Sequence, residues 1–325
     1  KRVVDALPLK DVEIVAAVLV HPTYHGYATD LKPLVALFHS EGWPVLVDEA
    51  HGAHFASGLD PCLPDSALDV GADLVVHSLH KSAGGLAQTA VLWLQGNMID
   101  PLVIQRSIGL LQTTSPSALL LASSEAALNE WYEPSAKRKI IKRIQEAREI
   151  AIQLRIYGLP LLKTQDPLRL ILHTAAEGIS GFDADSWFMA RGVVAELPEP
   201  GCITFCLGFA PQSGLKKLMH RCWNDLVDAF GSKTSSPSFK KPPSPLLSSP
   251  SMPLSLAWHS SRKRIPIAQA VGETAAELIC PYPPGISMLI PGEKLEQPQV
   301  DWFLEQHRLW PNNFPHQLMV VSNCK

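Results

Sequence analysis

The sequence predicts an α/β fold with a mostly parallel sheet, followed by a small α+β domain and a C-terminal module. In residues 1–158, apolar runs of strand length alternate with longer segments of helical period. Such alternation is typical of a parallel sheet covered by helices. A Ser/Pro-rich stretch at 232–257 then interrupts the apolar pattern, and residues 258–325 regain it.

The first block, residues 1–158, carries the expected sheet and its helices. We expect strands at Val12–Val20, Pro44–Val47, Leu74–His77 and Ala90–Leu94, and helices at Leu31–Ser40, Pro101–Gln112, Pro116–Tyr132 and Ser135–Tyr157. The last helix is rich in Lys, Arg and Glu at i,i+4 offsets and ends at Gly158. We therefore expect it to be the hinge between two domains.

The second block, residues 159–231, predicts the small α+β domain. Its expected strands and helices are Arg169–His173, Ile203–Phe209, Phe182–Ala190 and Gly214–Phe230. We expect residues 232–257 to be a linker, because a Ser/Pro-rich segment buries too little apolar area to order itself. The final module, 258–325, contains a Pro/Gly-dense turn at Cys280–Gly285.

The composition is that of a globular protein of about two domains. Of 325 residues, 46% are hydrophobic and 18% charged, which argues against disorder, a collagen-like repeat and a coiled coil. With 28 basic and 31 acidic residues the net charge is −3, so we expect a small-molecule or protein partner and no nucleic acid or membrane. The longest apolar run, Val12–Val20, is shorter than the roughly 20 residues that cross a bilayer.

Two further features concern the cellular setting. Six cysteines have neither disulfide-framework nor metal-ligand spacing, so we expect reduced thiols in a cytoplasmic protein: Cys62, Cys202, Cys206, Cys222, Cys280 and Cys324. The chain opens with Lys1-Arg2 rather than Met, and we expect it to be a fragment or a processed piece.

Polar clusters follow two of the expected strands. Asp48–His54 comes after Pro44–Val47, and His77–Lys81 comes after the strand that begins at Leu74. Ligands bind outside the carboxyl ends of strands in open α/β sheets. Lys81 follows Asp48 by 33 positions, about one crossover unit, so we expect both clusters in one site.

The residue types in these clusters suit pyridoxal 5'-phosphate. A partly desolvated Lys81 would expose a nucleophilic amine for Schiff-base chemistry. A strand-end Asp48 would keep a pyridine nitrogen protonated, so that the ring accepts electrons. Ser78 and His80 could donate to a phosphate. These four residues indicate a pyridoxal phosphate site better than any other cofactor site.

The same motifs resemble the Orn/Lys/Arg decarboxylase family, pyridoxal-phosphate enzymes of the aspartate aminotransferase fold (fold type I). The stretches that carry the resemblance are His21–Gly26, Asp48–His54, Ser78–Lys81, Gln112–Ser117, Glu277–Ile286 and Pro291–Glu293. The resemblance implies that residues 1–158 are the C-terminal portion of the large cofactor-binding domain and that 258–325 are the family's C-terminal domain. It also implies that a segment with the phosphate-binding turn and the ring-stacking residue precedes Lys1.

The resemblance implies a role for each matching residue. Lys81 would bind the cofactor covalently, Asp48 would pair with the ring nitrogen, and Ser78 and His80 would contact the phosphate. His51 would lie close to the ring. Ser115 would reach the cofactor phosphate of a neighbouring subunit, which requires at least a homodimer.

Structural interpretations compete with some of these roles. Asp48 could instead be a turn or N-cap residue, and His51 is as readily a core histidine as a ring contact. Thr114 and Ser115 before Pro116 are typical of a helix start. The spacings His51/His54 and His77/His80 could suggest zinc, but an i,i+3 pair on a strand points to opposite faces, so we expect no metal.

We therefore expect decarboxylation of arginine, lysine or ornithine to the amine and carbon dioxide. Lys81 would hold the cofactor, and either His80 or Lys81 would return a proton to Cα. Two alternatives stay open. Another fold-type-I enzyme, an aminotransferase or oxoamine synthase, would use Asp48 and Lys81 equally well, and a truncated homologue would hold no cofactor.

Overall fold

The computed structural model describes residues 13–58, 60–211, 213–231, 250–280, 287–311 and 314–322. The chain divides into two compact units. The first comprises residues 1–172 and 204–224, and the second comprises 173–203 and 225–325. No helix of the described residues is long and apolar enough to cross a membrane.

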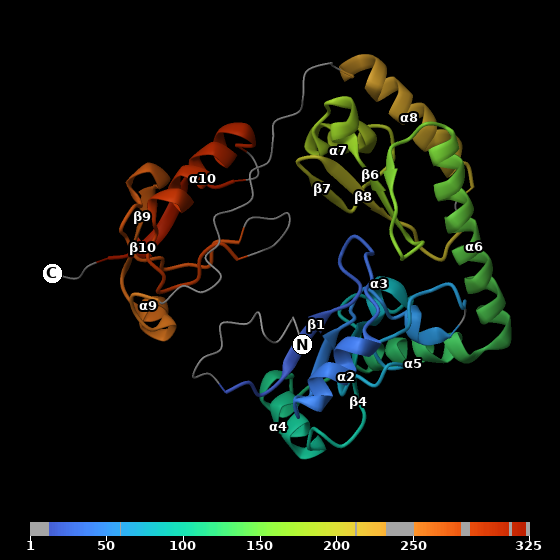
Figure 1. Ribbon diagram of the computed structural model, residues 1–325, viewed down its shortest axis with the longest axis horizontal. Helices are drawn as coiled ribbons and strands as arrows, with labels where there is room; N and C mark the ends of the chain where they lie inside the picture. Colours follow the sequence, from blue (N-terminus) through green and yellow to red (C-terminus); the bar gives the residue numbers. More distant parts are fainter. Residues whose placement is uncertain are drawn as a thin grey trace. The chain divides into compact units, whose positions relative to one another are not determined.

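A four-stranded sheet forms the centre of the first unit (Figure 1). Its order is β1 (Ala17–Val20), β2 (Val45–Asp48), β3 (Leu74–Ser78) and β4 (Ala90–Leu94). The first three strands are parallel, which confirms the mostly parallel sheet, whereas β4 is antiparallel to β3. The connection from β3 to β4 is too short for the crossover of a dozen or more residues that a parallel strand needs.

Helix α2 (Lys32–Ser40) packs on this sheet and supplies its main apolar core. Val35 and Phe38 of the helix join Val45, Val47 and Val75 of the strands in one buried cluster. Val45 and Val47 alternate with side chains that are less buried, as the two-residue period of a strand requires. The buried face of β2 is therefore fixed, and with it the position at which Asp48 leaves the sheet.

Three helices follow β4: α4 (Pro101–Leu111), α5 (Ala118–Tyr132) and α6 (Pro134–Ile156). Along α6, buried side chains recur at helical spacing, among them Ile140 and Ile144. These two pack with Leu79 and Trp131 in a second cluster. Helix α4 differs, because none of its residues is buried in the described part of the chain.

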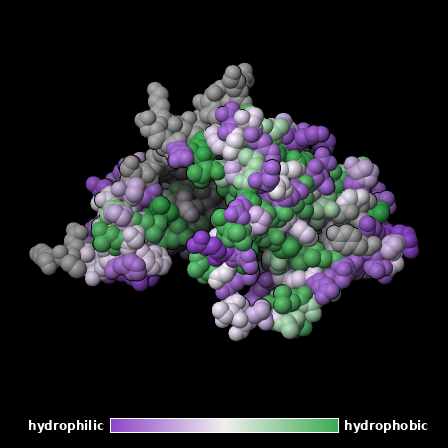
Figure 2. Space-filling model, turned by 90° about the horizontal axis from the view of Figure 1, so that it is seen from below, coloured by the Kyte–Doolittle hydropathy of each residue, from purple (hydrophilic) through white to green (hydrophobic). Residues whose placement is uncertain are grey.

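Figure 2 views the molecule from below, the side on which α4 lies in Figure 1, and shows apolar patches among polar ones. Leu110 and Leu111 at the end of α4 are 86% and 87% exposed. An apolar helix face that reaches solvent to this extent marks a surface that another molecule can cover.

The chain from α6 to α8 (Leu215–Phe230) contains short strands and α7 (Gly181–Met189). In the first unit, β5 (Leu161–Leu162) pairs antiparallel with β6 (Arg169–Leu172). Strand β8 (Cys202–Cys206) enters this unit at Thr204 and runs beside β6. In the second unit, β7 (Leu197–Glu199) precedes β8 and lies next to its start.

The second unit has its own core near the end of the chain. Helix α9 (Leu254–His259) leads to β9 (Arg262–Pro266), which pairs antiparallel with β10 (Gln317–Val321). Helix α10 (Gln297–Leu309) buries Trp302 and Phe303 in the same cluster as Leu318 and Val320. Residues 232–249 of the expected linker and residues 281–286 of the expected turn lie outside the described residues.

Some element boundaries differ from those predicted. Strand β1 begins at Ala17, and Val12 lies outside the described residues. The prediction of a helix start at Pro116 is wrong by two residues, because the Ser117 side chain accepts a hydrogen bond from the amide of Leu120 and caps α5. Strand β8 ends at Cys206 rather than Phe209.

Candidate functional site

The two polar clusters meet at the carboxyl edge of the first sheet, as expected. Asp48 ends β2 and is in register with Val76 of the adjacent parallel strand β3. The Lys81 Nζ lies 3.1 Å from Nε2 of His51, which joins the two clusters directly. Neighbouring parallel strands thus bring together residues that are far apart in the chain.

A single helical turn carries Lys81. This turn, α3 (Leu79–Ser82), begins immediately after β3, with Ser78 as its extended N-cap residue. Leu79 is 1% exposed and anchors the turn, while its amide donates to the carbonyl of Thr89 at 3.0 Å. Lys81 is exposed on the opposite side, and the buried Ser78 stays at the sheet edge. The amine is therefore presented to solvent from a firmly held backbone.

His80 is also exposed, and its protonation pattern is set by the backbone. Its Nδ1 lies 2.8 Å from the carbonyl oxygen of Thr89, which can only accept. Nδ1 therefore carries the proton, and Nε2 is the atom at which the ring gains or releases one.

His51 lies between two cationic side chains. Its Nε2 faces Lys81, and its Nδ1 lies 3.1 Å from Nη2 of Arg169. The ring of Tyr24 packs edge to face against the His51 ring, with a distance of 4.6 Å between the ring centroids. Burial, followed by the positive charges of Lys81 and Arg169, lowers the pKa of His51 to about 4, although Asp48 acts in the opposite direction. His51 is therefore a neutral ring near pH 7.

Arg169 and the loop that contains Tyr24 hold each other in place. Arg169 is 6% exposed and its Nε donates to the carbonyl of Tyr24 at 3.3 Å. Gly26 adopts φ +84°, and a methyl group there would lie 2.7 Å from Cγ of Arg169. Only glycine takes this conformation without strain and permits this approach. Arg169 and Tyr24 were not predicted as site residues from the sequence. The sole signal was the resemblance carried by His21–Gly26.

A buried acid lies behind the site. Glu49 is fully buried and accepts hydrogen bonds from the hydroxyl of Ser66, the amide of Ala67 and Nε2 of His77. The indole of Trp93 donates to Nδ1 of His77 at 3.0 Å, which leaves the His77 proton on Nε2. This network joins Glu49, which follows the last residue of β2, to His77 near the end of β3, and so fixes the two strand ends relative to each other.

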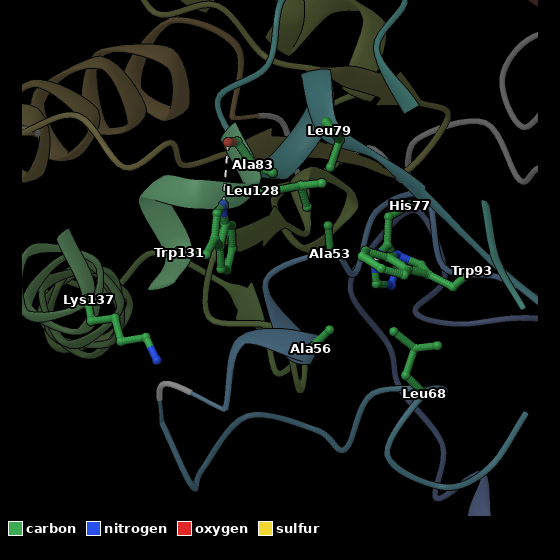
Figure 3. A pocket seen from close by; sticks show the side chains of 10 residues that line it. All are labelled: Ala53, Ala56, Leu68, His77, Leu79, Ala83, Trp93, Leu128, Trp131 and Lys137. Carbon is green, nitrogen blue, oxygen red and sulfur yellow. Dashed lines mark hydrogen bonds between the residues drawn. The ribbon is translucent and has the colours of Figure 1, made fainter. Parts of the chain in front are cut away.

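A cavity of about 150 Å³ adjoins this network beneath the turn that carries Lys81 (Figure 3). Leu79, Ala83, Leu128 and Trp131 make its walls mainly apolar. Figure 3 shows Trp131 hydrogen-bonded through its indole nitrogen to the carbonyl of Ala83, at 3.4 Å. The cavity therefore belongs to the packing under α3.

The remaining predicted residues lie as follows. Asp48 is exposed, and its Oδ1 accepts from the amide of Ala50 at 3.0 Å, so it does act as a turn residue. That contact leaves Oδ2 available at the sheet edge. Ser115 is exposed in the loop between α4 and α5, where its amide donates to Thr113 Oγ1. Its expected contact with a neighbouring subunit stays a prediction.

The histidines of the two H-x-x-H spacings have separate partners. His54 pairs with Asp166 at 3.1 Å, and both side chains are fully buried. Burial alone would raise the pKa of Asp166, but the charge and hydrogen bond of His54, together with Arg169, outweigh it and lower the pKa. Among the described residues, no group of three or more His, Cys, Asp or Glu could hold a metal ion.

The donor set fits pyridoxal phosphate. An exposed amine can condense with its aldehyde, and a carboxylate at the same sheet edge can pair with a protonated ring nitrogen. Ser78 is the N-cap residue of the turn that carries His80 and Lys81, and a hydroxyl and an imidazole are side chains that can bind a phosphate. These groups occupy the positions at which open α/β sheets bind ligands.

Comparisons with known proteins agree with this chemistry. Residues 1–158 match the family model "Orn/Lys/Arg decarboxylase, major domain", and residues 233–316 match "Orn/Lys/Arg decarboxylase, C-terminal domain". The arginine decarboxylase of Halalkalibacterium halodurans is 33% identical over 305 residues, which are 89% of this chain and 61% of the relative. The chain spans about three fifths of the length of the curated relatives it matches.

Solved structures show the same fold. The constitutive lysine decarboxylase of E. coli superimposes with a TM-score of 0.72 at 18% identity, covering 95% of this chain and 58% of that chain. Lysine decarboxylase A from Pseudomonas aeruginosa gives a TM-score of 0.72 at 15% identity, covering 98% and 59%. The expected fold type I is thereby confirmed.

Proposed function

The chain belongs to the Orn/Lys/Arg decarboxylase family, and from this premise we propose that it catalyses pyridoxal-phosphate-dependent decarboxylation of a basic amino acid. The products are the corresponding amine and carbon dioxide. The observation that carries the proposal is the exposed amine of Lys81 at the carboxyl edge of the sheet, joined through His51 to the cluster that begins with Asp48. The names of the curated relatives make arginine the first substrate to assay, before lysine and ornithine.

The cofactor would be held by residues of both clusters. Lys81 attaches it, Asp48 pairs with the ring nitrogen, and Ser78 and His80 contact the phosphate. His51 lies beside the attachment point. When bound, pyridoxal phosphate supplies an electron-accepting ring that stabilises the carbon left after carbon dioxide departs.

Residues of the chain would stabilise the charge on the cofactor ring and transfer the proton to the substrate. Asp48 is at the sheet edge with one carboxylate oxygen outside its turn, where it can keep a ring nitrogen protonated. A proton delivered by His80 leaves from Nε2, because Nδ1 is held by the carbonyl of Thr89. Lys81 is the second candidate donor to the substrate Cα, since its amine lies at the same edge.

The proposal extends to assembly and location. We place the protein in the cytoplasm as a homo-oligomer of at least two subunits. The exposed apolar end of α4, at Leu110 and Leu111, immediately precedes the loop that contains Ser115. A partner that covers this surface would bring Ser115 close to a second site, as the family resemblance implies.

A second candidate function is another fold-type-I reaction. The serine palmitoyltransferase of Sphingomonas wittichii superimposes with a TM-score of 0.51 at 17% identity over 66% of this chain. The match of residues 233–316 to a decarboxylase C-terminal domain favours decarboxylation. Release of carbon dioxide without a keto acid or an acyl-CoA would separate the two reactions.

Trapping with borohydride tests the proposal. The purified chain is incubated with pyridoxal phosphate, reduced, digested and mapped by mass spectrometry, and we expect one adduct, on Lys81. Lys81→Ala should abolish it, whereas the matched control Lys142→Ala, on the exposed side of α6, should not. An adduct spread over surface lysines would contradict the proposal and favour a homologue without a working site. Carbon dioxide release from arginine, lysine and ornithine then identifies the substrate.

A further inference from the structure

Arg169 is a buried cation whose direct partners carry no negative charge. Its side chain is 6% exposed. Nε donates to the carbonyl of Tyr24 at 3.3 Å, and Nη2 lies 3.1 Å from Nδ1 of His51. Buried charges in proteins are almost always paired with an opposite charge. In the described part of the chain, the contacts of Arg169 therefore leave its charge without an ion pair.

The buried acid Asp166 does not supply that ion pair. Its Oδ1 bonds to His54 at 3.1 Å and accepts from the amide of Leu168 at 2.9 Å, while its Oδ2 has no hydrogen-bond partner. Asp166 and Arg169 therefore attract each other only through space. Among the described residues, the second terminal nitrogen of the guanidinium group, Nη1, has no hydrogen-bond partner. This nitrogen can donate to a bound anion.

The guanidinium group of Arg169 is one imidazole ring away from the amine of Lys81. Nη2 faces Nδ1 of His51, and Nζ of Lys81 lies 3.1 Å from Nε2 of the same ring. Gly26 lets the arginine stem pass where a methyl group would lie 2.7 Å from its Cγ. The packing thus holds a guanidinium group beside the amine that the substrate amine replaces in the proposed function.

A basic amino acid carries one anionic group, its α-carboxylate, which is bonded to the same carbon as the reacting amine. Carboxylate and guanidinium groups form strong charge-assisted hydrogen bonds, whereas the cationic end of the substrate side chain is repelled by an arginine. We infer that Arg169 is a substrate-binding residue that donates from Nη1 to the α-carboxylate of a basic amino acid. The inference deepens the proposed function and rests on it for Lys81 as the point of cofactor attachment.

A chain that binds ligands but cannot turn them over tests this inference. The full chain is loaded with pyridoxal phosphate and reduced with borohydride, which fixes the cofactor on Lys81, and ligands are titrated by the fluorescence of the reduced cofactor. Arginine, lysine and ornithine are each compared with the amine that decarboxylation would give, since each pair differs only in the carboxylate.

The expected result is a loss of affinity for the amino acid alone. Arg169→Met should weaken its binding by about 10–100-fold, the range for a hydrogen bond between charged groups, and should change binding of the amine by less than about twofold. Arg169→Lys keeps a positive charge and should lose less, because an ammonium group lacks the planar fork of a guanidinium group. The matched control Arg138→Met, which removes an exposed charge from α6, should change neither affinity.

Three other outcomes have distinct meanings. Equal loss of affinity for an amino acid and its amine, or no binding of the three amino acids by the natural chain, would overturn the inference. A contact with the cofactor phosphate would instead make Arg169→Met weaken capture of pyridoxal phosphate but not of pyridoxal, and this result would overturn it as well. Absence of an adduct on Lys81 in the natural chain would contradict the proposed function itself, so the two failures are distinguishable.

Discussion

Replacing Gly26 with alanine should destabilise the protein more than the same replacement at Gly42. The two glycines have nearly the same left-handed conformation, with φ +84° and +79°. They differ in their surroundings. A methyl group on Gly26 would lie 2.7 Å from Cγ of Arg169 and 2.9 Å from Cβ of Asp166, whereas one on Gly42 meets nothing within 4 Å. Gly42 is thus a control matched for backbone strain.

The expected free energies follow from these two differences. An alanine in the left-handed region costs about 1–2 kcal/mol at either position. At Gly26 the methyl group also has to displace the stem of a buried arginine, and overpacking of this kind costs about 1–3 kcal/mol more. The free energy of unfolding should therefore fall by about 1–2 kcal/mol for Gly42→Ala and by about 2–5 kcal/mol for Gly26→Ala.

Urea unfolding followed by tryptophan fluorescence measures both changes. Equal losses of stability in the two variants would refute the argument that Gly26 is required for close approach to Arg169.

Three further predictions concern the site and its support. Asp48→Asn should lower the rate of carbon dioxide release by about 100-fold or more and leave the free energy of unfolding unchanged, because it removes the charge that keeps a ring nitrogen protonated. Steady-state assays with arginine check this prediction, and unchanged turnover would count against the role of Asp48. Glu49→Gln should lower the free energy of unfolding by about 1–3 kcal/mol, because both carboxylate oxygens of Glu49 accept hydrogen bonds and the amide nitrogen would face a donor in either orientation. An unchanged urea midpoint would contradict the network. Because the folded pKa of His51 is about 4 against 6.5 for the free side chain, its contribution to stability is present above pH 6.5 and lost as the pH falls toward 4. His51→Phe should therefore lose less stability than the natural chain between pH 7 and pH 4, as measured by the urea midpoint of unfolding. If the midpoints of the variant and of the natural chain fall equally over this range, the pKa of His51 is not lowered.

The sequence predicted the position of those candidate residues that depend on local pattern. Asp48 and Lys81 were expected at one sheet edge because each follows an apolar strand, and adjacent parallel strands must end at the same edge. The antiparallel direction of β4 was not predicted, since a strand's own residues do not encode which neighbour it pairs with. The capping residue Ser117 was missed because Thr114 and Ser115 have equally suitable side chains.

Arg169 could not be found in this way. It is 118 positions from His51, and its only sequence context is a short strand of the second predicted block. A charged residue at such a position is usually solvent-exposed, and only the three-dimensional path of the His21–Gly26 loop shows that this one is buried. The two interpretations of His51, core histidine and ring contact, were open for the same reason, because both its partners come from other parts of the chain.

Helix α4 has a consequence for how the protein responds to dilution. Isolated helices of about this length are marginal in water and are normally stabilised by burying one face. In the described part of the chain α4 buries none of its 11 residues. Residues 101–111 should therefore be protected from amide hydrogen exchange only while their apolar side is covered by another molecule. Their protection should decrease as the protein is diluted, while that of the β2 and β3 amides stays constant.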